Sequence, residues 1–378
     1  MDLLIDTVRR FVEREVRPSA RALEHADQYP HALVERMAEL GLFGMGVPTE
    51  FDGLGLDYVT YARIFEELSR GWMSLAGVIG THGIVCYVVR EFGTDEQKRR
   101  WLPALAAARL RGGLALTEPQ GGSDVANLRT RAQKDGDGWI LDGEKQFITN
   151  THEGNVFLVV ARTGGAGAGG LSAFVVEKAR VAAGTLPNTL IEGKPLKKLG
   201  YKGLKTSSLT FDGCRVDGDA LVGGVPGRGF AQVMSGLEVG RINVAARAVG
   251  VARAALEDSL AYARERRTFG RPIVEHQAVA HKLADMATGV TAARELYLAA
   301  ARKKDAGERA DLEAAMAKLF ASEMCARATL DGIEIHGGYG YTDELDVERY
   351  YRDAPLFCVG EGTNEILRTV IARRLVQP

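Results

Sequence analysis

The stretch LALTEPQGGSD, residues 114–124, marks the point at which the character of the chain changes. It is a strand-like apolar run that ends in a turn rich in proline and glycine, with hydroxyl groups at Thr117 and Ser123. Such a turn brings backbone N–H groups and small polar side chains close to a ligand. An ordinary connecting loop explains the same residues equally well, so this stretch alone leaves both interpretations open.

The chain before this stretch has the periodicity of helices. Apolar residues between positions 8 and 16 fall on one helical face. Further helices are predicted near residues 31–40, 57–70 and 72–91. Thr94, followed by two acidic residues and Gln97, is typical of a helix start and predicts another helix that runs toward residue 110.

After the stretch, short β-rich runs alternate with turn residues as far as about residue 222. The predicted strands lie at 139–141, 146–149, 156–160, 171–176 and 207–211. Several short strands at this spacing indicate a barrel-like or sandwich-like β domain. The run GAGAGG at 165–170 satisfies the GxGxxG pattern, but it leads into a strand and not a helix. A hairpin loop is therefore the better interpretation than a dinucleotide-binding turn.

The last part of the chain is helical again. Long amphipathic segments at 234–264, 274–304 and 309–335 predict a four-helix bundle. The fold class is thus α+β, with a helical domain at 1–112, a β domain at 113–222 and a helical bundle at 223–378.

Composition excludes several classes of protein. The 378 residues carry a net charge of −1, which gives no electrostatic reason to expect nucleic acid or an anionic membrane as a partner. We find no apolar run long enough to cross a bilayer and no secretory signal, so we expect a cytoplasmic protein. The four cysteines are far apart and predict free thiols, and the seven histidines show no metal-binding spacing, so we expect no metal.

Four more motifs could carry chemistry. FITN at 147–150 could place an aromatic ring beside a planar cofactor, although Phe and Thr are common strand residues. RRTFGRP at 266–272 could bind pyrophosphate through arginine, or could simply end a helix. IHGGYGY at 335–341 allows close backbone approach to a ligand. GEGTNEI at 360–366 sets a carboxylate between two glycines, or merely starts a capped helix.

Together, these five motifs in this order resemble the acyl-CoA dehydrogenase family, and the resemblance covers almost the whole chain. The residues that it places around a flavin ring are Leu116, Thr117, Ser123, Phe147 and Thr149. It implies FAD as cofactor, with the adenosine end held across a subunit interface, and hence a homo-oligomer, typically a tetramer. The residues implied at that end are Arg267, Phe269 and Gln277, and further cofactor contacts are implied for Glu334, Gly337, Gly338, Thr363 and Glu365. Glu334 departs from the family, which usually has Gln there.

The resemblance also implies a reaction. Glu361 matches the catalytic base, which takes the α-proton of an acyl-CoA while the β-hydrogen leaves as hydride to the flavin, giving a trans-2-enoyl-CoA. Electrons then pass to electron-transfer flavoprotein, as in fatty acid metabolism. Some members carry the base on a bundle helix, but the matching residue here is Gly240, so the role falls to Glu361.

Substrate contacts are the least determined. Ser123, Glu238 and Arg241 are expected near the CoA moiety, although Glu238 and Arg241 could instead form a surface ion pair on a helix. Gly360 stands where straight-chain members commonly have Tyr, which suggests room for a branched or bulky acyl group. Met73 stands where glutaryl-CoA members have Arg, which disfavours a dicarboxyl substrate.

Three other functions stay open at this point. An acyl-CoA oxidase would use oxygen as acceptor, but oxidases usually have an extra C-terminal domain. A flavin monooxygenase on the same fold generally lacks the glutamate that Glu361 supplies. A non-catalytic relative that binds CoA or nucleic acid is disfavoured by the near-zero charge and by Glu361.

Overall fold

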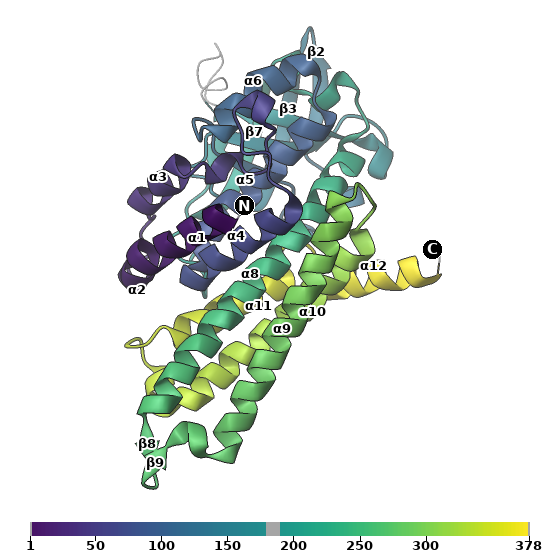
Figure 1. Cartoon of the computed structure of the whole chain (residues 1–378). Coiled ribbons are helices and arrows are strands. Elements are labelled where there is room, and N and C mark those ends of the chain that lie inside the picture. Colours follow the sequence, from purple (N-terminus) through teal and green to yellow (C-terminus); the bar gives the residue numbers. More distant parts are fainter. Residues whose placement is uncertain (1, 179–189, 377–378) are drawn as a thin grey trace.

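In the computed structural model, which describes residues 2–178 and 190–376, the first third of the chain is helical (Figure 1). Its helices are α1 (Asp2–Phe11), α2 (Arg17–His25), α3 (His31–Glu39), α4 (Tyr58–Gly71), α5 (Met73–Phe92) and α6 (Asp95–Ala106), with a π-helical turn at Val12–Val16. Thr94 caps α6, because its hydroxyl accepts from the Gln97 N–H at 3.3 Å and the Gln97 side chain accepts from the Thr94 N–H at 2.9 Å. The predicted extension toward residue 110 is wrong, since α6 ends at Ala106 and Ala108 has left-handed backbone (φ 56°).

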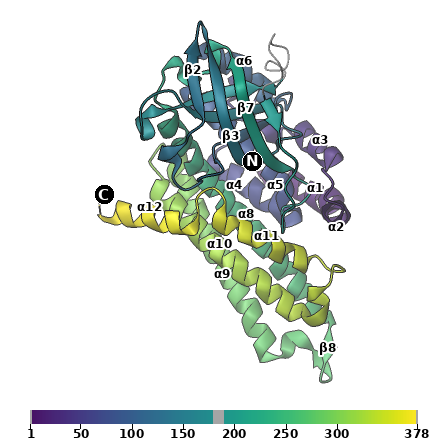
Figure 2. The same ribbon diagram turned by 180° about the vertical axis from the view of Figure 1, so that it is seen from behind.

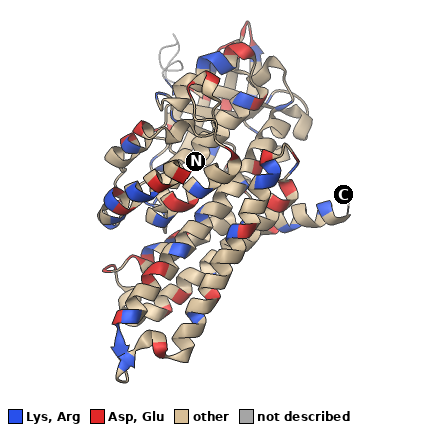
Figure 3. Ribbon diagram, in the orientation of Figure 1, with Lys and Arg blue, Asp and Glu red and all other residues tan. Residues whose placement is uncertain are grey.

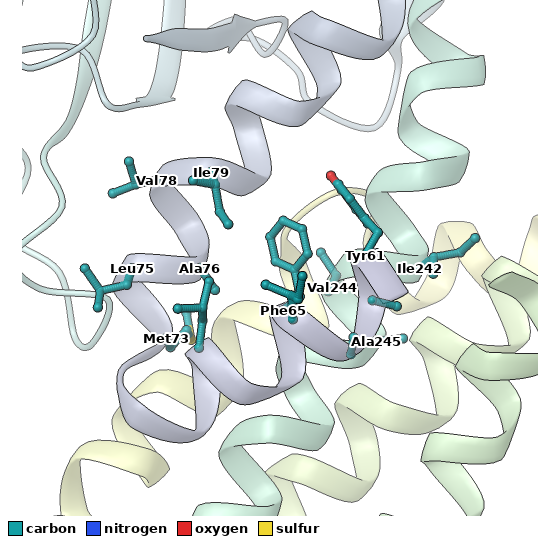
Figure 4. Packing of buried hydrophobic residues seen from close by; sticks show 14 of the residues in the cluster. Tyr61, Phe65, Met73, Leu75, Ala76, Val78, Ile79, Ile242, Val244 and Ala245 are labelled. Carbon is teal, nitrogen blue, oxygen red and sulfur yellow. The ribbon is translucent and has the colours of Figure 1, made fainter. Parts of the chain in front are cut away.

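Helix α5 is the most apolar helix in this part of the molecule. An 18-residue window of this 20-residue helix has a mean hydropathy of 1.3, so by length and composition it could cross a membrane, and the sequence argument that no run is apolar enough overlooked it. In the fold, 83% of the apolar window is buried. Packing between other helices therefore accounts for its composition. Figure 4 shows its side chains meeting those of α4 and α8.

The middle of the chain forms a seven-stranded sheet. Its strands are β1 (Gly112–Ala115), β2 (Arg131–Asp135), β3 (Gly138–Thr149), β4 (Val156–Arg162), β5 (Leu171–Glu177), β6 (Leu190–Glu192) and β7 (Thr206–Val216). The order is β1-β4-β2-β3-β7-β6, with β5 paired to β4. The loop at 165–170 joins the antiparallel strands β4 and β5, as the hairpin interpretation predicts.

Strand β3 contains two of the predicted strands in one. The runs at 139–141 and 146–149 were separate predictions, but they belong to a single strand paired with β7. The register shifts twice, between Leu141 and Gly143 and between Lys145 and Ile148. These irregularities bend the strand without ending it. The second shift contains Phe147, whose φ is 60°.

The C-terminal part is a helical bundle that extends away from the sheet (Figures 1 and 2). Its helices are α8 (Gly229–Glu265), α9 (Gln277–Asp305), α10 (Asp311–His336), α11 (Val347–Val359) and α12 (Asn364–Val376). A short hairpin of β8 (Arg267–Thr268) and β9 (Arg271–Pro272) lies at the far end of the bundle. Helix α12 projects from the body in both views. The helical–β–helical order and the α+β fold class are confirmed.

A buried ion-pair network fixes α8 against its neighbours. Glu66 on α4 is 4% exposed and accepts two hydrogen bonds from Arg294 of α9, at 2.7 and 3.0 Å. Arg253 of α8 donates to the same carboxylate at 3.1 Å, and Tyr297 donates at 2.6 Å. Burial alone would raise the pKa of Glu66, but these donors lower it below its ordinary value. The carboxylate therefore stays ionised and ties three helices together.

Candidate active site

Glu361 lies in the short connection between α11 and α12. Its φ is 52° and that of Gly362 is 96°, so the chain turns sharply through left-handed backbone at both residues. Thr363 caps α12 by accepting from the Ile366 N–H at 3.4 Å, so the motif does start a capped helix. A glutamate held in this conformation costs energy, and such strain is common at functional sites.

The Glu361 carboxylate faces helix α8 at Gly240. The side chain is 22% exposed, but Oε2 is enclosed and has no hydrogen-bond partner among the described residues. A Cβ built at Gly240 would lie 2.3 Å from this oxygen. Only glycine therefore leaves room for the carboxylate. A side chain at position 240 would therefore point to the same place that the Glu361 carboxylate occupies.

Three buried cations surround this carboxylate. Arg247 Nη1 lies 4.0 Å from Oε1, and Lys318 donates to the carbonyl of Gly362 at 2.8 Å. Burial raises the pKa of Glu361 to about 7, while Arg247, Lys318 and Arg241 each act to lower it. Burial also lowers the pKa of Lys318 to about 8. A carboxyl group poised near neutral pH is suited to proton abstraction.

Sequence reasoning missed Arg247 and Lys318 as parts of this site. Each is a single cation inside a helical segment that is otherwise mostly apolar, AARAVGVA and AAMAKLF. Both side chains are almost entirely buried, with Arg247 4% and Lys318 0% exposed. A charge on the apolar side of a helix needs a partner, so this pattern was the signal that could have revealed them.

A narrow cavity lies between α4, α5 and α8 beside the base. Its volume is about 20 Å³, and Tyr61, Ile79, Gly83 and Val239 are among its lining residues. His82 on α5 is a buried core residue, and its Nδ1 accepts from the Gly112 N–H at 2.9 Å.

The structure brings together four of the five residues predicted around a planar ring. The Gln146 N–H donates to the carbonyl of Thr117 at 2.8 Å, which sets the end of β1 beside the end of β3. Leu116 is buried, Thr149 is half-buried and Phe147 is 63% exposed. Ser123 is exposed on the following loop. An aromatic ring held exposed at a bulge offers a surface for a planar ligand.

A second group of predicted residues lies at the far end of the bundle. A pocket of about 650 Å³ is lined by Arg266 and Thr268 of the hairpin region and by Gly337 and Gly338 after α10. Arg267, Gln277 and the 95%-exposed Phe269 belong to the same end. Basic side chains concentrate on the hairpin (Figure 3). Such a surface is suited to a pyrophosphate.

One predicted cofactor contact has another partner. Glu334 is exposed and forms an ion pair with Lys282 of α9. His336 at the end of α10 donates from Nδ1 to the Gly332 carbonyl at 2.7 Å and stacks on Tyr262, so it has a structural role.

Within one chain, the two predicted groups do not meet. Residues 116–149 belong to the sheet, whereas 267–277 and 334–338 lie at the opposite end of the bundle in both views (Figures 1 and 2). Thr363 and Glu365 lie at the start of α12, beside the base. A single ligand could touch both groups only if a second copy of the chain supplied one of them.

The surface ion pair considered for Glu238 and Arg241 is wrong. Both residues are buried on α8, at 8% and 9% exposure, and Glu238 pairs with Lys304 of α9 at 2.9 Å. The Arg241 Nε has no hydrogen-bond partner among the described residues, and burial lowers the pKa of its guanidinium. Arg241 therefore lies beside the base and is not an exposed charge.

One group of described residues has the donor types of a metal site. Glu24, His25 and Glu348 lie close together, and both carboxylates already form ion pairs with Arg352. Three of the four cysteines are buried and Cys358 is half-buried, and none of the four forms a disulfide.

Comparison with known proteins identifies relatives along the whole chain. Models of the acyl-CoA dehydrogenase N-terminal, middle and C-terminal domains match residues 2–109, 113–214 and 227–376. The chain is 41% identical to a (2S)-methylsuccinyl-CoA dehydrogenase of Cereibacter sphaeroides, over 100% of this chain and 69% of that protein. The solved butyryl-CoA dehydrogenase of Megasphaera elsdenii is 33% identical with a TM-score of 0.95, over 100% of this chain and 98% of that chain. A structure described for the electron transferring flavoprotein of Acidaminococcus fermentans has a TM-score of 0.95 at 37% identity, over 100% and 98% of the two chains.

Proposed function

Because the chain belongs to the acyl-CoA dehydrogenase family, we propose that it removes hydrogen from the α and β carbons of a short acyl-CoA, with Glu361 as the base. The observation that carries the proposal is the Glu361 carboxylate. It is enclosed against Gly240, faces buried cations and has a pKa of about 7. These features together suit a group that must be ionised and then accept a proton.

The chain's own residues prepare the substrate for this proton transfer. The α-proton of a thioester is a poor acid, so its removal needs stabilisation of the negative charge that develops on the thioester oxygen. We assign this role to the backbone N–H of Glu361. The enclosed position of Oε2 keeps water away from this oxygen, which strengthens its interaction with the α-proton.

The family is FAD-dependent, and two features of the structure fit this cofactor. Phe147 and Thr149 at the end of β3 form an aromatic and hydroxyl surface for the ring, with Leu116 and Thr117 beside them. The basic hairpin and the open backbone at Gly337 and Gly338 suit the pyrophosphate and adenosine. When bound, FAD supplies the oxidant that accepts the β-hydrogen and its electron pair.

A homo-oligomer follows from the separation of these two groups. We propose that the hairpin end of one subunit completes the cofactor site of another. Exposed aromatic side chains at that end support a subunit contact there, with Phe269 95% and Tyr341 88% exposed. A tetramer would be consistent with both observations. The likeness to the Acidaminococcus fermentans structure supports electron-transfer flavoprotein as the electron acceptor.

A short acyl group is supported by the relatives. The names of two similar proteins specify methylsuccinyl-CoA and butyryl-CoA, both with a four-carbon main chain.

The test is the anaerobic visible spectrum of the purified holoenzyme as acyl-CoAs are added one at a time. Loss of the flavin band with butyryl-CoA or 2-methyl-branched thioesters is the expected result. A yellow protein that none of the thioesters bleaches would contradict the proposal and favour a monooxygenase or a non-catalytic relative.

A further inference from the structure

One face of helix α8 carries polar groups into the interior beside the base. Gly240, Asn243 and Arg247 are spaced by three and four residues, so they share this face. The face is directed at Gly80 of α5. A Cβ built at Gly80 would lie 3.3 Å from Asn243 Nδ2, 3.5 Å from its Oδ1 and 3.6 Å from Arg247 Nη1. The absence of a side chain at Gly80 therefore leaves both polar groups directed at the same small volume.

The Arg247 guanidinium is buried without a close ionic partner. The residue is 4% exposed, and its Nε has no hydrogen-bond partner among the described residues. Its Cζ lies 5.5 Å from the ring centre of Tyr201 and 5.7 Å from that of Phe357, so two aromatic rings frame it. Among the described residues, the carboxylate of Glu361 is the only one within 4.0 Å of the Arg247 guanidinium, and the distance from Nη1 to Oε1 is 4.0 Å. The Tyr201 hydroxyl accepts a hydrogen bond from this guanidinium, so the Nε is the donor that an added anion would satisfy.

Asn243 adds a second unmet need at the same point. It is 1% exposed, and neither its amide nitrogen nor its amide oxygen has a partner among the described residues. Buried polar groups are normally hydrogen-bonded, so an amide without partners beside a guanidinium whose Nε has none marks the position of a polar ligand group. An anion that accepts several hydrogen bonds satisfies the guanidinium and the amide nitrogen together.

We propose that Arg247 and Asn243 bind a second carboxylate on the acyl group, so that the substrate is a short dicarboxylic acyl-CoA. This inference rests on the proposed dehydrogenase function, because it uses Glu361 to place the α-carbon. Arg247 Nη1 lies only 4.0 Å from Glu361 Oε1, so the second carboxylate must lie close to the α-carbon. With carbon–carbon bonds of about 1.5 Å, two or three carbons span that gap.

The sequence argument against a dicarboxyl substrate looked for a cation at position 73, whereas this proposal places the cation at Arg247. Met73 is 1% exposed and begins α5, where it packs in the core between helices (Figure 4). Its identity therefore reports on core packing and says nothing about charge beside the base. The cation at the base comes from α8 instead.

A purely electrostatic role for Arg247 is the competing explanation. In that case Arg247 would only hold the Glu361 charge, and its loss would slow every acyl-CoA to the same degree. A carboxylate-binding role predicts instead that the loss depends on the substrate. The two explanations therefore predict different ratios of the rate with a carboxylate-bearing substrate to the rate with its methyl-ended partner.

The experiment compares matched thioesters in the holoenzyme and in two variants. The pairs are succinyl-CoA with butyryl-CoA, and glutaryl-CoA with pentanoyl-CoA, which differ only by a carboxylate in place of a methyl group. In at least one pair, we expect the wild type to have a higher kcat/KM for the thioester that carries the second carboxylate than for the thioester that ends in a methyl group. In Arg247→Gln the ratio of carboxylate to methyl substrate should fall at least 100-fold, mainly through KM, and Arg247→Lys should recover part of it. Flavin content and melting temperature show whether each variant is folded.

The outcomes separate this inference from the proposed function. Turnover of butyryl-CoA or pentanoyl-CoA, with both dicarboxyl thioesters rejected, would overturn the second-carboxylate site and leave the dehydrogenase function standing. An unchanged ratio in Arg247→Gln would also overturn it, in favour of the electrostatic role. A flavin that no thioester reduces would contradict the proposed function itself.

Discussion

Replacing Gly240 by alanine tests the position of the Glu361 carboxylate without changing Glu361. The new Cβ would lie 2.3 Å from Glu361 Oε2, whereas ordinary contacts begin at 3.4 Å. The carboxylate must therefore move by about 1 Å, and a displacement of that size costs a rate of roughly 100-fold. We expect flavin reduction by a good acyl-CoA substrate to slow by about this factor in Gly240→Ala.

The stability of this variant should move in the opposite direction. Gly240 lies inside α8, and alanine in place of glycine within a helix stabilises it by up to about 1 kcal/mol. A variant that reduces its flavin more slowly, with a melting temperature no lower than that of the wild type, would show that the carboxylate has moved while the fold is intact. A variant that is slow and also has a lower melting temperature would indicate a disturbed fold instead.

The assay is rapid mixing of the anaerobic holoenzyme with saturating substrate, followed at the flavin band. Gly332→Ala on α10 is the matched control, because its Cβ would be 3.3 Å from the nearest atom, the Ser259 hydroxyl oxygen, away from the base. The control should react within a few-fold of the wild type. A Gly240→Ala variant that reacts at the wild-type rate would refute the seating of the carboxylate against α8.

Further predictions concern the charges and contacts around the site. Because burial raises the pKa of Glu361 to about 7, kcat/KM should rise as pH increases through about 7 and then level off; a profile flat from pH 5.5 upward would contradict the buried base. Lys318→Met removes a cation that lowers this pKa, so the inflection of the profile should move to higher pH, and a shift to lower pH would contradict the assignment. Because the folded protein raises the pKa of Glu361, ionising this group above its unfolded pKa lowers the free energy of unfolding. At pH 8, Glu361→Gln should therefore have a higher free energy of unfolding than the wild type, by up to about 3 kcal/mol, as measured by denaturant titration. At pH 4.5 the two proteins should differ little. Arg267→Ala should lower the ratio of flavin to protein after gel filtration, and full retention would argue against a cofactor contact at the hairpin.

Most of the architecture could be predicted from local pattern. The 3.6-residue periodicity of 234–264 and the capping signal at Thr94 predict helices because both depend on neighbours in the sequence. The predicted break within β3 was wrong because two irregularities bend the strand and pairing with β7 holds it together. Pairing between distant segments cannot be deduced from a local pattern.

The sequence predicted the residues of the candidate site that lie in recognisable motifs and missed those that lie outside them. Glu361, Thr117 and Phe147 stand in short distinctive runs of sequence, so they could be singled out. Arg247 and Lys318 stand in ordinary helical sequence, and they become part of the site because α8 and α10 bring them to Glu361. The argument against a dicarboxyl substrate considered Met73 alone, because the approach of Arg247 to Glu361 depends on how the helices pack.

The most direct test of the central claim is flavin reduction in Glu361→Gln. Glutamine keeps the size of the side chain but cannot accept the α-proton, so single-turnover reduction by the best acyl-CoA should slow by at least about 10³-fold. The variant should keep its flavin and still bind the acyl-CoA, seen as a shift of the flavin spectrum without bleaching. Reduction at the wild-type rate would contradict the assignment of Glu361 as the base.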